Sequence, residues 1–97
     1  MILHHFSSGV YCREMTLKAG HEVDTHEHKY DHIAILGSGS VIVELDGEME
    51  HRTGPCVIDI AAGKKHRIQA LTDIVWFCVH ATDVADPEQM DEVLIKE

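Results

Sequence analysis

Histidine is the residue type in this chain best suited to chemistry, and it gathers in one stretch. Four of the nine histidines fall within residues 20–39, and they are His21, His26, His28 and His32. His26 and His28 are two residues apart, so on an extended strand their side chains project from the same face. A bend at Lys29-Tyr30 can turn His32 back toward this pair. Because neutral imidazole is a common ligand of transition metals, the spacing predicts three ligands of one metal site.

Surface histidines offer the competing explanation, because an isolated His-x-His pair is more often solvated than metal-binding. The third histidine and the flanking glycines favour a site. A second segment, from Gly54 to His66, adds another pair of glycines and a further histidine that could serve as a fourth ligand.

The first segment resembles the first motif of the cupin family, G-x5-H-x-H-x3,4-E-x6-G. The chain reproduces this spacing completely, with Gly20, His26, His28, position 32 and Gly39 at the motif positions. The one departure is that position 32 carries His where the motif has Glu.

The second segment resembles the second cupin motif, G-x5-P-x-G-x2-H-x3-N, less closely. Gly63 and His66 have the separation of the motif, and Gly54 lies one residue farther away. Ala61 stands where the motif has Pro, and Ala70 stands where it has Asn.

The resemblance covers about residues 10–82 and implies a cupin-type double-sheet jelly-roll barrel, with residues 1–97 forming one domain. A subset of small cupins has the same exchange of Glu for His and looks like a four-histidine metal site. The implied ligands of one divalent transition metal are therefore His26, His28, His32 and His66. Imidazole ligands leave Fe, Mn, Ni, Zn and Cu all open. Four neutral ligands leave the ion at +2, which favours anionic ligands.

Periodicity also predicts an all-β chain. Strands separated by turn residues are expected at 10–17, 22–28, 31–36, 40–45, 48–52, 56–60, 66–70 and 73–80. Asp46-Gly47 is a strong hairpin signal, and residues 37–39 are expected to form a turn. Residues 1–8 are ambiguous. Asp86-Pro87-Glu88 carries the start signals of a short C-terminal helix, whose apolar stripe would hold Met90, Val93 and Leu94.

Composition disfavours several classes of partner and location. Seventeen acidic and eight basic residues give a formal charge of −9, so we expect neither nucleic acid nor an anionic membrane as a partner. No apolar run is long enough to span a membrane, and residues 1–6 lack the features of a signal peptide. We therefore expect a cytoplasmic protein. Three cysteines without an export signal argue against a disulfide framework.

The only basic cluster is formed by Lys64, Lys65 and Arg67, on either side of His66. It is either a solvated turn or the edge of a metal pocket that attracts an anionic substrate.

Strand alternation makes a prediction about oligomeric state. If His32 faces the barrel interior, then Ile33 and Ile35 point outward, although both are strongly apolar. The same outward orientation is expected for the apolar residues Val57, Val75, Phe77 and Val79. A strand that is apolar on both faces is normally covered on both, so we expect a homodimer.

Three classes of function fit these observations. The first is a metal-dependent enzyme acting on a small, anionic organic molecule, with a dioxygenase foremost because open-sided histidine sites in cupins often handle O2. The second is an isomerase, lyase or sugar-processing cupin that uses the metal as a Lewis acid, and the third is a non-catalytic ligand-binding module. Weak candidates for catalytic residues are His80, Tyr30 and Cys78, for each of which ordinary packing is the simpler explanation.

Overall fold

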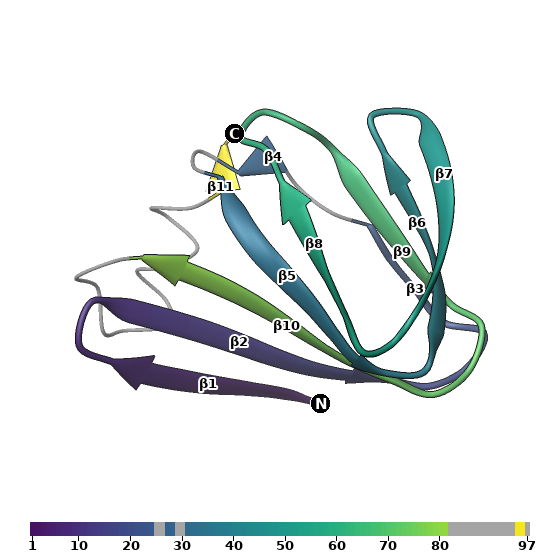
Figure 1. Cartoon of the computed structure of the whole chain (residues 1–97), viewed down its shortest axis with the longest axis horizontal. Helices are drawn as coiled ribbons and strands as arrows, with labels where there is room; N and C mark the ends of the chain where they lie inside the picture. The colour runs from purple at the N-terminus through teal and green to yellow at the C-terminus, as the bar shows by residue number, and fades with distance from the viewer. Residues whose placement is uncertain (25–26, 29–30, 82–94, 97) are drawn as a thin grey trace.

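The computed structural model describes residues 1–24, 27–28, 31–81 and 95–96, which form antiparallel strands joined by short turns (Figure 1). The strands are β1 (Ile2–Ser7), β2 (Val10–Leu17), β3 (Glu22–Asp24), β4 (Glu27–His28), β5 (His32–Ser38), β6 (Ser40–Leu45), β7 (Glu48–Thr53), β8 (Cys56–Ile60), β9 (His66–Ala70), β10 (Ile74–Ala81) and β11 (Ile95–Lys96). This confirms the predicted all-β class. The expected helix, beginning at Asp86, falls on residues outside those described. Within the described part of the chain, no helix has the length and apolarity needed to cross a membrane.

Several expected boundaries differ from the structure. β5 begins at His32, β7 ends at Thr53 and the last long strand spans Ile74–Ala81, each one residue away from the expected bounds. Residues 1–8, which the sequence left ambiguous, contain β1, and this strand pairs with β2 along its whole length. The pairing depends on a tertiary contact, so the sequence of residues 1–8 shows no local strand pattern. β5 continues to Ser38, which pairs with Val75 beside an irregularity in β10, so the expected turn at 37–39 shrinks to Gly39. The single strand expected at 22–28 appears as β3 and β4, with 25–26 outside the description.

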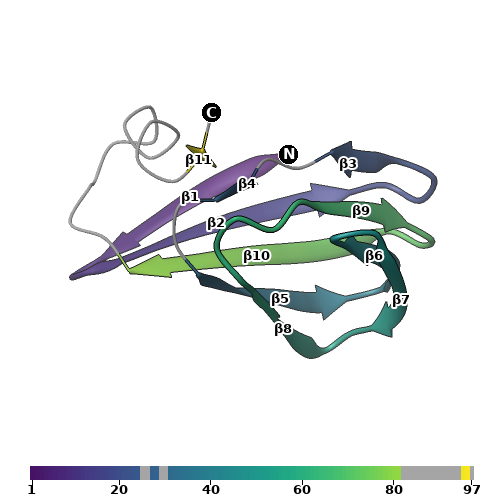
Figure 2. The ribbon, with the colours of Figure 1, turned by 90° about the horizontal axis from the view of Figure 1, so that it is seen from above.

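Two sheets face each other across the interior (Figures 1 and 2). One has five strands in the order β1-β2-β10-β5-β8, and the other has four in the order β3-β9-β6-β7. The short pair β11-β4 lies near one end of the barrel (Figure 1). The apolar core lies between the sheets and consists of Ala34, Leu36, Val41, Val43, Ile58, Ile60, Ile68, Ala70, Ile74 and Trp76.

The alternation of side chains along β5 and β10 follows the prediction. In β5, His32, Ala34 and Leu36 are buried, whereas Ile33 is 45% exposed. In β10, Trp76 and His80 are buried on the inner face. The same strand register therefore places both the core side chains and the buried histidines on the inner face.

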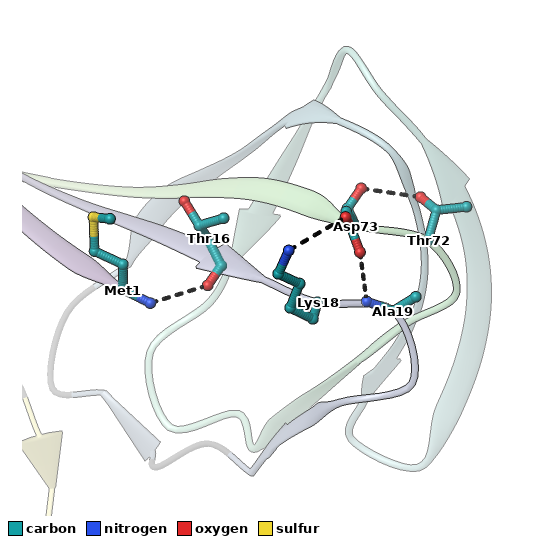
Figure 3. Close-up of polar contacts among 6 residues, drawn as sticks. All are labelled: Met1, Thr16, Lys18, Ala19, Thr72 and Asp73. Atoms are coloured by element: carbon teal, nitrogen blue, oxygen red, sulfur yellow. Dashed lines mark hydrogen bonds and ion pairs between the residues drawn. The ribbon is translucent and has the colours of Figure 1, made fainter.

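A set of polar contacts ties the turn before β10 to the end of β2 (Figure 3). The Asp73 carboxylate accepts a hydrogen bond of 2.9 Å from the Ala19 backbone N–H, and its other oxygen lies 3.9 Å from Lys18 Nζ. Where β1 begins beside β2, the N-terminal amine of Met1 donates to the Thr16 carbonyl at 3.3 Å. These contacts hold β1, β2 and β10 in register where the five-stranded sheet turns toward the four-stranded one.

Two glycines with positive φ have different surroundings, and this difference is testable. Gly39 (φ 90°) is so enclosed that an added Cβ would lie 2.7 Å from Ile74 Cγ2 and 2.8 Å from Thr72 Oγ1. No described residue comes within 4 Å of the same position on Gly47 (φ 89°). Gly47→Ala should therefore lower the free energy of unfolding only by the conformational cost, about 1–2 kcal/mol. Gly39→Ala should lower it by that cost plus about 1–3 kcal/mol for overpacking. Urea unfolding of both variants measures the difference, and equal losses would contradict the close approach at Gly39.

Candidate functional site

Two of the predicted metal ligands meet inside the barrel from opposite sheets. His32 is the first residue of β5 in the five-stranded sheet, and His66 is the first residue of β9 in the four-stranded sheet. Each side chain is 5% exposed, and the two ring centres are 6.0 Å apart with the ring planes inclined at 54°. Residues separated by more than thirty positions in sequence are thus brought close together in the interior.

This spacing fits two imidazoles bound to one ion. With a metal–nitrogen distance of about 2.0–2.1 Å, ligand angles of about 90–180° place the two ring centres roughly 4.5–6.4 Å apart. The observed 6.0 Å lies inside that interval. The nitrogen donors suit Fe, Mn, Ni, Zn or Cu, so the two residues fit the predicted transition metal without selecting one.

The other two predicted ligands are described less fully. The backbone of His28 lies in β4, where it pairs with Ile95 of β11, and His26 lies outside the described residues. Within the described part of the chain, no three His, Cys, Asp or Glu side chains come close enough together to hold an ion. The four-histidine site therefore stays a prediction that requires His26 and His28.

His80 lies against the pair formed by His32 and His66. Its ring stacks on His32 with centres 4.5 Å apart, and it is itself buried on the inner face of β10. Tyr11 stacks on the far side of His80 with centres 6.0 Å apart and shares a hydrogen bond of 2.7 Å with Nδ1 of His4. A row of rings therefore runs from His4 on the exposed edge strand to His66 in the opposite sheet.

Sequence analysis overlooked Tyr11 and His4. Tyr11 alternates in phase with Met15 and Leu17, and this is the signal that could have placed it on the inner face. Its position beside His80 depends on the β2–β10 register, and His4 depends on β1, which had no recognisable pattern.

The remaining weak candidates gain little support as catalytic residues. Tyr30 lies outside the described residues. Burial raises the pKa of the Cys78 thiol, an effect that the nearby Trp76 and Arg13 side chains only partly offset. A protonated thiol is a poor nucleophile, so packing is the better explanation for Cys78.

The basic cluster around His66 is exposed and largely neutralised. Lys64 Nζ lies 2.9 Å from an Asp46 carboxylate oxygen, and the Arg67 guanidinium lies 3.6 Å from Glu22. These pairs favour the interpretation of this segment as a solvated turn.

A pocket of about 290 Å³ adjoins the site at the ends of β5 and β8. Its lining residues are Asp31, His32, Ile33, Asp59, Ile60 and Ala61. The two carboxylates in this wall disfavour an anionic ligand on this side of His32.

The raised pKa of Cys78 makes a prediction about reactivity. Because the thiolate is the reactive form, iodoacetamide should label Cys78 in the folded protein more slowly, and with a midpoint at higher pH, than in urea. Mass spectrometry of peptides after timed labelling between pH 7 and 10 measures both. Equal pH profiles in the folded and unfolded states would show that burial does not control this thiol.

Comparison with known proteins adds evidence on the fold. No protein-family model matches the sequence, and no curated protein matches it. Solved structures do match. A cupin 2 domain-containing protein from Halorhodospira halophila aligns over 95% of this chain and 73% of its own, with a TM-score of 0.76 and 17% identity.

Two further structures extend the likeness. KdgF from Halomonas sp. aligns over 92% of this chain and 80% of its own, with a TM-score of 0.73 and 16% identity. Salicylate 1,2-dioxygenase from Pseudoaminobacter salicylatoxidans, in its adduct with gentisate, aligns over 94% of this chain but only 26% of its own, with a TM-score of 0.75 and 16% identity. At such low sequence identities, the structural likeness supports a shared fold and not a shared function. The described strands have the cupin-type jelly-roll fold.

Proposed function

We propose that this chain is a metal-binding cupin that acts as a metal-dependent enzyme on a small, anionic organic molecule. The observation that carries the proposal is the approach of His32 and His66, two buried imidazoles from opposite sheets whose ring centres are 6.0 Å apart. His26 and His28 complete the proposed ligand set.

The chain's own residues supply a rigid, water-poor setting. His32 and His66 would hold the ion from strand ends, and His80 fixes the orientation of the His32 ring by stacking on it at 4.5 Å. Trp76 and Leu36, buried in the same sheet, close the deeper interior to water. A bound divalent ion with open positions would supply Lewis-acid or redox chemistry there.

A dioxygenase is our first proposal for the reaction class. Support comes from the proposed all-imidazole donor set and from the structural likeness to salicylate 1,2-dioxygenase. The alternatives are a Lewis-acid isomerase or lyase, a sugar-processing cupin, or a non-catalytic ligand-binding module. Oxygen uptake in the presence of small carboxylates separates these classes. A dioxygenase consumes O2 when loaded with Fe(II) and not when loaded with Zn(II), whereas a Lewis-acid enzyme turns over substrate with Zn(II).

Metal content of histidine variants tests the ligand set. His26→Ala, His28→Ala, His32→Ala and His66→Ala should each lower the metal bound per chain. At free metal about 100 times Kd, binding contributes about 2.7 kcal/mol to the stability of the parent, and each variant should lose most of it. His51→Ala, on exposed β7, is the matched control and should change neither quantity. Elemental analysis and chemical unfolding provide the two measurements. Full occupancy in His32→Ala would contradict the four-ligand proposal.

Acid should release the metal. Each ligand must be neutral, and free imidazole takes up a proton with a pKa of about 6.5. Protons therefore compete with the ion, so occupancy and the stability that it adds are present at neutral pH and fall as the pH drops through the acid range. More than one proton should be taken up per ion released. Potentiometric titration alongside metal analysis measures this ratio, and release without proton uptake would contradict histidine ligation.

We also propose that the chain forms a homodimer through the outer face of the five-stranded sheet. Val57, 59% exposed, pairs with Ile35, which pairs with Phe77, and these side chains form an apolar row across β8, β5 and β10. The row ends at Glu14 of β2. A polar border around an apolar centre is the usual arrangement of a protein interface.

A charge placed on that row should separate the two copies. Val57→Lys should reduce the mass in solution from twice the 10.9 kDa chain mass to that of one chain. Met49→Lys, at a 71% exposed position on β7 of the other sheet, should leave the dimer intact. Light scattering after size-exclusion chromatography distinguishes these outcomes, and a monomeric parent would contradict the proposal.

A further inference from the structure

Arg13 is the one cation that the fold places on the inner face of the five-stranded sheet among the described residues. It lies in β2 directly opposite Cys78 of β10, in the inward-facing row next to the one that contains Tyr11 and His80. The side chain is partly buried, and its Nε atom is buried without a hydrogen-bond acceptor among the described residues. An arginine is charged at every physiological pH, so this group carries a permanent positive charge into the barrel.

No described residue supplies a counter-charge on that face. The register places Glu14 of β2 and Asp59 of β8 on the opposite, outer face. The inward positions on the four strands from β2 to β8 are occupied, apart from Arg13, by Tyr11, Met15, Leu17, Ile74, Trp76, Cys78, His80, His32, Ala34, Leu36, Cys56, Ile58 and Ile60. A partly desolvated guanidinium with an unmade hydrogen bond is costly, and an anionic ligand would remove that cost.

Surface cations of this chain contrast with Arg13. Lys64 pairs with Asp46, Arg67 approaches Glu22, and Arg52 donates to Glu50 at 2.9 Å. Two of the three basic residues around His66, Lys64 and Arg67, are therefore engaged, whereas Arg13 has a buried Nε on the inner face that makes no hydrogen bond to any described residue.

We propose that Arg13 binds the carboxylate of a small organic acid whose other end lies at the histidine site. The planar guanidinium matches a carboxylate with two parallel hydrogen bonds, which a lysine cannot reproduce. β2 and β5 are separated by β10 alone. Two strand spacings and one two-residue step put the backbones of Arg13 and His32 roughly 12 Å apart. Both side chains are on the inward-facing side of their strands, and a molecule of a few carbons or a single ring would bridge this span. This inference rests on the proposed function, because the histidine site would hold the other end of the molecule.

Binding of matched probes tests the role of Arg13. The probes are benzoate and its neutral isostere benzamide, together with acetate as a minimal carboxylate, titrated calorimetrically into the metal-loaded and the chelator-treated protein. The parent should bind benzoate more tightly than benzamide. Arg13→Met should weaken benzoate about 10- to 100-fold, since hydrogen bonds to charged groups are lost, and should leave benzamide unchanged. Arg13→Lys should lie between the two. Arg52→Met, which removes an exposed and paired arginine, is the control and should bind as the parent does.

Thermal stability gives a second readout that a purely structural role would not produce. Without ligand, Arg13→Met should melt at the same temperature as the parent or higher, because an unsatisfied buried group is removed while the apolar stem is kept. Benzoate should raise the melting temperature of the parent and not that of the variant. An Arg13→Met variant that unfolds, or that melts at a lower temperature than the parent, would overturn the inference. Equal benzoate affinity in the parent and in Arg13→Met would also overturn it, as would a parent that binds neither benzoate nor acetate.

Metal analysis of the same samples separates this inference from the proposed function. A parent without bound metal that still discriminates benzoate from benzamide through Arg13 would contradict the metal site alone. A metal-loaded parent that does not discriminate would contradict the role of Arg13 alone.

Discussion

The insertion of β10 between β2 and β5 is the pairing on which the rest of the structure depends. It places His80 against Tyr11 on one side and against His32 on the other. Because side chains alternate along each strand, fixing one inward-facing residue fixes every other one. A shift of one residue in β10 would bury Phe77 and Val79 and would turn Trp76 and His80 outward. The site and the core therefore share one register.

The same alternation gives the molecule two different apolar surfaces. The inner one is covered by the four-stranded sheet, and it contains the large buried side chains Trp76, Leu36 and Ile60. The outer one, which includes Val57 and Ile33, is exposed in the isolated chain. Charge is divided in a similar way, since the surface cations Lys64, Arg67 and Arg52 have acidic partners, while Arg13 has no counter-charge among the described residues of the inner face. An acidic chain can therefore present a local positive charge to a ligand inside the barrel, where screening by solvent is weak.

Much of the fold could be predicted from sequence because its signals are local. The strands at 10–17, 40–45, 56–60 and 66–70 have the expected bounds, since alternation and turn residues act over a few positions. The inward orientation of His32 followed from the same rule. β1 could not be predicted, because its edge position comes only from pairing with β2.

The candidate site was less predictable than the fold, because its composition depends on register. The spacing of the histidines pointed to His32 and His66, and the structure brings these two together. The row through Tyr11 and the placement of Arg13 require knowing which residues lie opposite one another across β2 and β10. The sequence instead drew attention to the cations nearest His66 along the chain. The structure shows that Lys64 is engaged by Asp46 at the surface, so proximity in sequence was a poor guide to charge near the site.

The central claim is that imidazoles from opposite sheets share one metal ion. X-ray absorption spectroscopy of the Zn(II)-loaded protein tests this most directly, because it reports the atoms bound to the ion. We predict a first shell of nitrogen at about 2.0–2.1 Å, with the outer-shell scattering of several imidazole rings and fewer such rings in His66→Ala. A shell dominated by sulfur or by carboxylate oxygen, or a spectrum that is identical in His66→Ala, would contradict the account.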